Sequence, residues 1–400
     1  MFGILNSKNA GELALVFDVR SSSVGGALVR LHKRGVPSIV LSLRESIMNG
    51  GGSADVDKFL FSTSKALDAV ASKIFKAGLG APTKIFCILS SPWHISQTRI
   101  INLKKDKPFS FSLALADDLI KKEVLAFKEE HLAPHKKTKH ELKIIELQNL
   151  KTMLNGYETY NPLDQKVEEV EMTLLISMSP EQVLSSIENV IKKYFHHETI
   201  KFASHTLAYF SVIRNLFMKQ ENFILIDVGG EVTELTMIKK NVLCESGSFP
   251  IGHLSITRGL ASFISSTEGE ATSYLTLLNH GHAEVLTEKK LKPIIDQLKM
   301  EWLKNFQESL ANLSKDISVP YTIYLSVHKD FMNFFAEAIK AEQFNQYTLT
   351  ESKFEVILLN PETLHGLVLF EKDMVREPYL MIDSAYINHF LIYPAKAGHI

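Results

Sequence analysis

One supersecondary pattern occurs twice in this chain, and it constrains the fold more than any other feature. The first copy begins with the apolar run 13–17, which is typical of a buried strand and ends in Asp18. A small polar turn follows, and strand-like runs then cover 25–31 and 37–43 with a basic turn between them. This order predicts a three-stranded meander with a carboxylate at its first turn.

The second copy has the same order, with a glycine turn in place of the polar one. The apolar run 223–226 ends in Asp227, Gly229 and Gly230 follow, and two more strand-like runs cover 232–249. Glycines let backbone N–H groups approach a phosphate closely, and an Asp can hold a metal ion or water beside it. The alternative is a plain hairpin with a glycine turn. Because the unit recurs, we expect two related lobes whose turns face a shared cleft.

These two turns resemble the phosphate-1 and phosphate-2 loops of the actin, sugar kinase and Hsp70 superfamily, and the chain is most similar to its FtsA and PilM types. The second copy reads Asp-Val-Gly-Gly at 227–230 and Phe-Pro-Ile-Gly-His at 249–253, followed by a helical stretch at 255–264. The superfamily has D-x-G-G-G-T-x-D, then P-x-G-G, then a helix. The similarity in order and spacing covers most of 13–339. It implies an α/β fold, namely a two-lobed actin-like (ribonuclease H-like) ATPase fold with a small α+β insertion.

The resemblance also implies a domain organisation. In it, 1–107 form the first actin-like lobe (IA), which 196–221 complete, and 222–345 form the second lobe (IIA and IIB). Residues 108–195 form an inserted subdomain similar to the SHS2-like (1C) subdomain of FtsA and PilM, and 346–400 supply C-terminal strands that pack on the lobes. In the relatives this insertion makes protein–protein contacts. The alternative is an ordinary α+β insertion with no partner.

Local patterns predict several further elements. The spacing of apolar residues predicts a helix over 201–218. Ser179 is expected to cap another helix, with Pro180 at the first helical position and Gln182 completing a capping box. The tail contains three strand-like pieces, at 354–359, 366–370 and 379–393.

The cofactors that the resemblance implies are ATP and Mg²⁺, and it assigns no catalytic residue. The candidate nucleotide-binding residues are Asp18, Arg20, Ser21, Ser22, Asp227, Gly229, Gly230, Gly252 and Ser326. The two carboxylates, Asp18 and Asp227, are also the candidate metal ligands.

The predicted cleft departs from the superfamily pattern on its phosphate side. Arg20 stands where the family has the glycine of D-x-G, and its guanidinium could either pair with a phosphate or fill the site. Glu231 stands in the place of the third glycine, where a carboxylate would repel a triphosphate unless a metal intervened.

The adenosine side departs as well. The turn expected at 326–329 has no glycine, although side chains in strained turns cost on the order of 1–3 kcal/mol each. The stretch 275–278 is Leu-Thr-Leu-Leu where the family carries a Glu and a Lys, and 202–207 has no carboxylate to orient an attacking water. Together the departures weigh against nucleotide binding and further against hydrolysis.

Composition excludes some other classes of function. The net charge of −1 gives no electrostatic basis for nucleic-acid binding, and no apolar run approaches the ~20 residues of a membrane span. The N-terminus lacks the layout of a signal peptide, and Cys87 and Cys244 are expected to be reduced core residues. The sequence therefore predicts a cytoplasmic protein.

The resemblance favours an actin-like scaffold of a cytoplasmic, inner-membrane-associated machine, most like the PilM type of type IV pilus assembly. Its partner would be a cytoplasmic peptide of a membrane protein, added as a strand to a sheet edge or held in a groove beside the insertion. The C-terminus, AYINHFLIYPAKAGHI, has one Lys and no Arg, so we do not expect a basic membrane-binding helix there. The alternatives are an FtsA-like cell-division protein and, from another class, an active ATPase or phosphotransferase. Self-association has no visible sequence motif.

Overall fold

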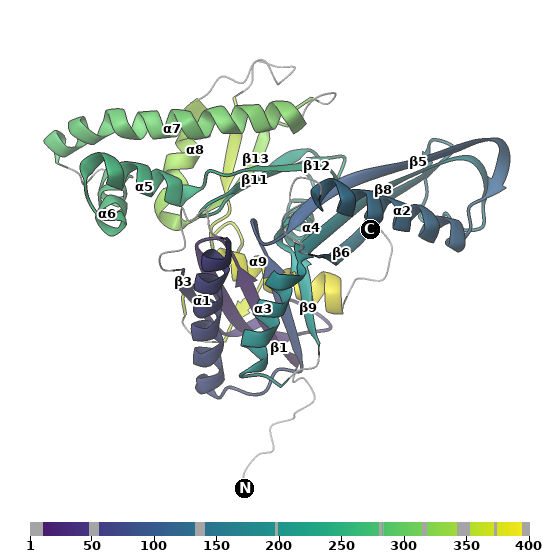
Figure 1. The fold of residues 1–400 in the computed structure, drawn as a ribbon, viewed down its shortest axis with the longest axis horizontal. Coiled ribbons are helices and arrows are strands. Elements are labelled where there is room, and N and C mark those ends of the chain that lie inside the picture. The colour runs from purple at the N-terminus through teal and green to yellow at the C-terminus, as the bar shows by residue number, and fades with distance from the viewer. Residues whose placement is uncertain are drawn as a thin grey trace, which may run out of the picture.

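The protein was analysed as a computed structural model, which contains two α/β lobes and a third, long sheet that projects from them (Figure 1). It describes residues 11–47, 56–132, 141–196, 199–279, 282, 284–313, 318–341, 353–371 and 374–393. Across these residues, none of the helices is both long enough and apolar enough to cross a bilayer.

The first lobe is built on a six-stranded sheet of order β15-β3-β2-β1-β4-β9. Its first three strands form an antiparallel meander, and β4 and β9 extend the sheet in parallel. The strands are β1 (Glu12–Val19), β2 (Ser23–Leu31), β3 (Ser38–Ser46), β4 (Lys84–Leu89), β9 (Ile200–Ser204) and β15 (Leu369–Phe370).

The second lobe repeats this topology. Its sheet has the order β12-β11-β10-β13-β14, with an antiparallel meander followed by two parallel strands. The strands are β10 (Phe223–Val228), β11 (Thr233–Lys239), β12 (Val242–Phe249), β13 (Thr322–Val327) and β14 (Glu355–Leu358). The two meanders predicted from the sequence are confirmed.

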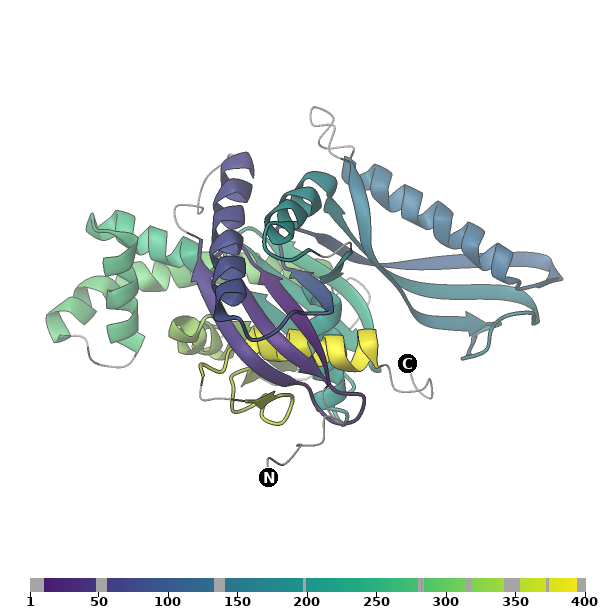
Figure 2. The same ribbon diagram turned by 90° about the horizontal axis from the view of Figure 1, so that it is seen from below.

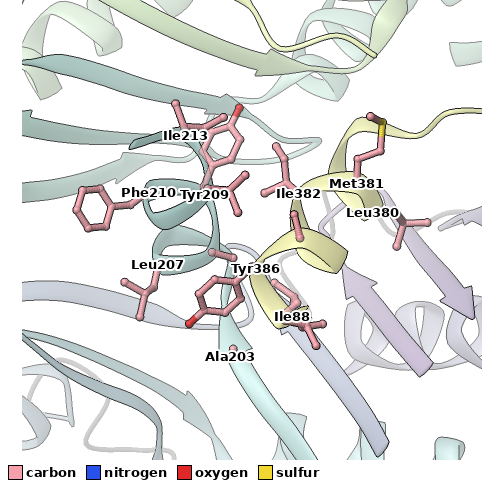
Figure 3. Packing of buried hydrophobic residues seen from close by; sticks show 14 of the residues in the cluster. Ile88, Ala203, Leu207, Tyr209, Phe210, Ile213, Leu380, Met381, Ile382 and Tyr386 are labelled. Carbon is pink, nitrogen blue, oxygen red and sulfur yellow. The ribbon is translucent and has the colours of Figure 1, made fainter. Parts of the chain in front are cut away.

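Helices cover both faces of the first sheet, and one helical layer is shared by the two lobes. The helices α1 (Val56–Ala77) and α3 (Glu181–Lys192) pack on one face. On the other face lie α4 (His205–Leu216) and α9 (Pro378–Tyr386), the latter continued by a π-helix at Ile387–Ile392. Figure 3 shows α4 and α9 packed together, and their apolar core includes side chains of both sheets.

The outer face of the second sheet has its own helices. They are α5 (His253–Ile264), α6 (Glu268–Asn279), α7 (Val285–Leu313), a 3₁₀ turn (Lys329–Phe331) and α8 (Met332–Ala341). Together with this face of the sheet they form a separate core around Trp302 and Phe306.

Strand alternation fixes where the two candidate carboxylates, Asp18 and Asp227, point. In β1, residues 15, 17 and 19 pack toward α1, whereas 14 and 16 pack toward α4 and α9. Asp18 shares the second face because side chains alternate along a strand. Asp227 is placed in the same way on β10, since residues 223 and 225 join the shared core. Both carboxylates therefore point into the layer between the sheets.

The third sheet lies in sequence between β4 and β9, which are neighbours in the first sheet. Its strands are β5 (Ile95–Ser110), β8 (Lys166–Pro180), β6 (Leu142–Leu154) and β7 (Tyr157–Glu158), in that order across the sheet. Helix α2 (Leu113–Leu132) runs along one face (Figure 2). The sheet begins at Ile95, before residue 108, where the resemblance places the start of the insertion.

Glu146 of β6 anchors this sheet to the first lobe. Its Oε2 accepts hydrogen bonds from the Ser204 hydroxyl at 2.6 Å and the Ser204 N–H at 3.2 Å. Its Oε1 accepts one from the Tyr386 hydroxyl at 2.7 Å. Because Ser204 also caps α4, one carboxylate holds the third sheet, α4 and α9 together.

Two elements differ from the sequence predictions. The stretch expected to be a helix over 201–218 begins with strand β9, whose five residues pair with β4, and the helix starts only after the capping residue Ser204. The expected strand at 379–393 is instead the helix α9 and the π-helix. Residues 380–388 are all buried, so the segment has no exposed polar face and its sequence shows no helical period.

Two local predictions also need correction. The predicted turn at 326–329 begins only at His328, because β13 stays paired with β10 through Val327. The predicted capping box does not form: Pro180 precedes the first helical residue of α3, and the Ser179 hydroxyl donates to the Trp93 carbonyl at 2.7 Å. Of the C-terminal stretch considered for membrane binding, 394–400 lie outside the described residues.

Candidate functional site

The two candidate carboxylates hold equivalent positions at the ends of the central strands. Asp18 is the penultimate residue of β1 and pairs with Gly25 of β2, while Asp227 is the penultimate residue of β10 and pairs with Ser326 of β13. Both side chains are buried, with 0% and 4% exposure. The meander topology therefore brings them from opposite lobes to one buried interface.

The guanidinium of Arg20 lies between these two carboxylates. Its Nη2 donates to Asp227 Oδ2, and its Nη1 lies 3.7 Å from Asp18 Oδ1. The carbon of the guanidinium lies 3.6 Å from the ring centroid of Tyr379, a stacking contact that favours the cation. Arg20 is 3% exposed, so it belongs to the interior of the interface.

The charges around Arg20 keep it ionised. Burial alone would lower the pKa of Arg20, but Asp227, and to a smaller degree Asp18 and other neighbours, outweigh burial and raise that pKa above its ordinary value. Burial also raises the pKa of Asp227, and Arg20 opposes this rise. The pair therefore depends on mutual neutralisation, as is usual for buried ions.

A second arginine completes the network from the first lobe. Arg44 Nη2 donates to Asp18 Oδ2 at 2.5 Å and to Glu377 Oε2 at 3.0 Å. Glu377 in turn caps α9 by accepting from the Leu380 N–H at 2.8 Å. The last described helix is thus tied directly to the first carboxylate.

Two further titratable groups behind the network are expected to be neutral. Burial, assisted by the charge of Asp18, raises the pKa of Asp383 on α9 well above its usual range. Burial and the nearby Arg20 lower the pKa of His205 on α4, so its 3.6 Å approach to Asp227 is not an ion pair.

The glycines of the second turn allow protein segments to approach one another closely. A Cβ on Gly252 would lie 2.3 Å from the carbonyl oxygens of both Gly229 and Gly230. A Cβ on Gly230 would lie 2.5 Å from the Cβ of Ser22 in the other lobe. Side chains at these positions would therefore force apart the loops that meet here.

Several backbone donors expected to face a phosphate already have partners within the protein. The first N–H groups of α5, from His253 and Leu254, donate to the carbonyls of Gly229 and Gly230, each at 2.9 Å. The N–H of Glu231 donates to the Ser21 hydroxyl across the lobes at 3.1 Å.

Glu231 does not point at an empty phosphate position. Its two carboxylate oxygens accept hydrogen bonds from both Nη atoms of Arg258 on α5, at 2.8 and 2.6 Å. This bidentate pair compensates the charge that the sequence indicated would repel a triphosphate.

Aromatic rings pack together at the turn after β13, on the expected adenosine side. The ring of His253 lies 5.0 Å from that of Phe331 and 5.7 Å from that of His328, measured between centroids. Leu275 of the neighbouring α6 is buried in the second-lobe core.

The residues present do not fit Mg-ATP. Arg20 supplies the positive charge between Asp18 and Asp227, where a metal ion would have to lie, and several loop N–H groups are already paired. Within the described ranges, no three His, Cys, Asp or Glu side chains are grouped to hold a metal ion.

The structure brings all of the predicted site residues to this interface, although in contacts with one another. Sequence reasoning missed four residues that complete it: Arg44, Glu377, Tyr379 and Asp383. Only one of them carries a local signal: Asp383 is an acidic residue within the apolar run of α9.

A groove of about 910 Å³ lies elsewhere, between the third sheet and the second lobe. The edge strands β5 and β12 meet where the Ser246 hydroxyl donates to the Ser96 carbonyl at 3.0 Å, and the groove is lined beyond that point by both strands. Ile100 projects from one wall with 57% exposure, and Tyr321 lies on the other.

Comparison with known proteins identifies the fold. No family model and no curated protein matches the chain. Among solved structures, the PilM–PilN type IV pilus biogenesis complex matches with a TM-score of 0.57 and 13% identity, covering 93% of this chain and 96% of that chain. The chain therefore has the two-lobed actin-like fold that its sequence predicts.

Weaker matches include the ethanolamine utilization protein EutJ from Carboxydothermus hydrogenoformans, with a TM-score of 0.43, 9% identity and coverage of 94% of this chain and 89% of that one. Another is a Bacteroides thetaiotaomicron protein with an actin-like ATPase fold and unknown function, with a TM-score of 0.38, 10% identity and coverage of 90% and 95%.

Proposed function

Starting from the actin-like fold, we propose that this chain is a non-enzymatic scaffold of a cytoplasmic, inner-membrane-associated assembly, most like PilM in type IV pilus assembly. One observation carries the proposal: the fold matches the PilM–PilN structure over 93% of the chain, yet Arg20 lies between Asp18 and Asp227, the two carboxylates that the sequence resemblance offers as metal ligands. We therefore expect this protein to bind partners through its surfaces and not to bind or hydrolyse ATP.

The first test is binding of Mg-ATP to the purified chain. We expect no heat in calorimetric titration up to millimolar nucleotide and no change in Tm, because Arg20 lies between the two candidate metal ligands and loop donors such as the Glu231 N–H are already hydrogen-bonded. A Kd in the micromolar range would contradict the proposal and would favour the ATPase alternative, which turnover of ATP would then establish.

The partner is proposed to be a cytoplasmic peptide of a membrane protein, and membrane association would run through it. The matched PilM structure is a complex with PilN, which supports a protein partner. The groove between the third sheet and the second lobe is the proposed binding place. Ile100 and Tyr321 offer it apolar contacts, and the edge strand β12 offers backbone groups to an extended chain.

The second test places a photo-crosslinking amino acid at Ile100 in living cells. We expect mass spectrometry to identify a crosslink to the cytoplasmic segment of a membrane protein. The matched control is Phe61 on α1, which is 60% exposed and lies outside the groove. Equal labelling from both positions, or crosslinks only to further copies of this chain, would count against the groove.

A further inference from the structure

We infer that Arg20 is a built-in lock that ties Asp18 of the first lobe to Asp227 of the second, so that the lobes hold one closed arrangement without any ligand. This goes beyond the scaffold function, which requires only that nucleotide is not used. It assigns to one side chain the compensation of charge where the central strands of the two lobes end, in addition to the apolar core that both sheets share.

The first step of the argument is the geometry of the contact. Arg20 follows β1 in the first lobe, and it bonds Asp227 at the end of β10 in the second. The backbone of Arg20 is also held in place, since the Trp93 indole N–H donates to the Arg20 carbonyl at 3.2 Å. Tyr379 of α9 stacks on its guanidinium. The side chain is therefore held rigidly across the interface.

The second step is the charge that Arg20 compensates. Asp18 keeps Arg44 as a partner at 2.5 Å if Arg20 is removed. Asp227 loses the cation that contacts its Oδ2, and its remaining neighbours include the Ser326 hydroxyl and, at 3.6 Å, the His205 ring. A buried carboxylate without a partner is strongly unfavourable, and opening of the interface to water relieves it. Loss of Arg20 should therefore separate the lobes at Asp227.

The third step is that two other hydrogen bonds between the lobes bring no cation to Asp227. The Ser91 hydroxyl donates to Glu234, and the Ser21 hydroxyl accepts from the Glu231 N–H. They align the lobes, but neither of them compensates the charge of Asp227.

The test compares Arg20→Met with the double variant Arg20→Met/Asp227→Leu in the full chain. We expect the single variant to lose roughly 5–10 °C in Tm and to gain radius of gyration in small-angle scattering. The double variant should regain the wild-type radius and most of the Tm, because it removes the orphaned charge along with its partner. Arg30→Met, which removes the exposed pair with Glu371, is the matched control and should change Tm by no more than about 2 °C.

A second readout separates a lock from an ordinary buried ion pair. In Arg20→Met the uncompensated carboxylate of Asp227 should take up a cation beside Asp18, so millimolar Mg²⁺ alone should raise the Tm of this variant and reduce its radius. Mg²⁺ should do neither for the wild type or the double variant. If Arg20→Met keeps the wild-type radius and responds to Mg²⁺ no more than Arg30→Met, the lock does not exist. Nucleotide binding by the wild type would instead overturn the scaffold proposal, so the two failures are distinguishable.

Discussion

Replacing Trp93 by alanine should lower the free energy of unfolding by about 3–5 kcal/mol, the usual cost of deleting a buried tryptophan side chain. Trp93 is 2% exposed, and its ring lies 4.7 Å from that of Phe59 on α1. Its indole N–H donates to the Arg20 carbonyl, and its own carbonyl accepts from the Ser179 hydroxyl. The variant therefore loses core packing and the support of the Arg20 turn together.

Urea unfolding would measure this effect, and two variants control for it. Trp93→Phe keeps most of the ring volume but removes the N–H, so its loss should be smaller, about 1–2 kcal/mol. Phe61→Ala removes an exposed ring from α1 and should cost no more than about 0.5 kcal/mol. Because the chain has two tryptophans, Trp302 still reports on the second lobe. A loss under about 1 kcal/mol in Trp93→Ala would contradict the described packing.

The second large effect is a loss of folding stability as the pH rises through the pKa of the Glu234 carboxyl. Burial, and then the charge of Asp227, raises the pKa of this carboxyl from 4.5 to about 7. The folded chain therefore binds this proton more tightly than the unfolded chain does. The contribution is fully present below about pH 4.5 and is lost as the pH rises through about 7, which amounts to about 3 kcal/mol.

Glu234→Gln isolates this contribution, because glutamine is neutral and keeps an oxygen that can accept from the Ser91 hydroxyl. Burial lowers the pKa of His94 to about 4 and that of His253 to about 3, and such histidines make stability rise with pH instead. These histidines contribute equally to the wild type and to Glu234→Gln. We expect similar stabilities at pH 5 and a more stable variant at pH 8. Parallel pH profiles of the two proteins would exclude the effect.

The repeat made the fold predictable, because the two meanders are set by local alternation and by one acidic residue at the end of each first strand. The elements that were missed depend on distant partners. Ile200–Ser204 becomes a strand because β4 lies beside it, and α9 lacks an exposed polar face because it is buried in the core that the two sheets share. Neither property has a local period that a sequence window could detect.

The sequence predicted most of the residues that form the candidate site, but it did not predict which atoms they contact. The sequence left Arg20 with two options, pairing with a phosphate or filling the site, and the choice depends on the position of Asp227 more than 200 residues away. The glycine pattern indicated approach to a phosphate, but the same freedom lets Gly230 and Gly252 approach other protein atoms. The local sequence indicates that another group approaches these glycines closely. Only the assembled lobes show that this group belongs to the protein itself.

The position of α9 also has a consequence for the order of folding during synthesis. The strands of the second sheet all come from 223–358, whereas the first lobe combines residues near the start of the chain with β9, α4 and α9, which begins only at Pro378. Because chains begin to fold as they leave the ribosome, the second lobe has every strand it needs before the first lobe receives α9. The lobe that is translated first is therefore completed last. Until Glu377 and Tyr379 emerge, Arg44 and Arg20 lack the contacts that hold them in place.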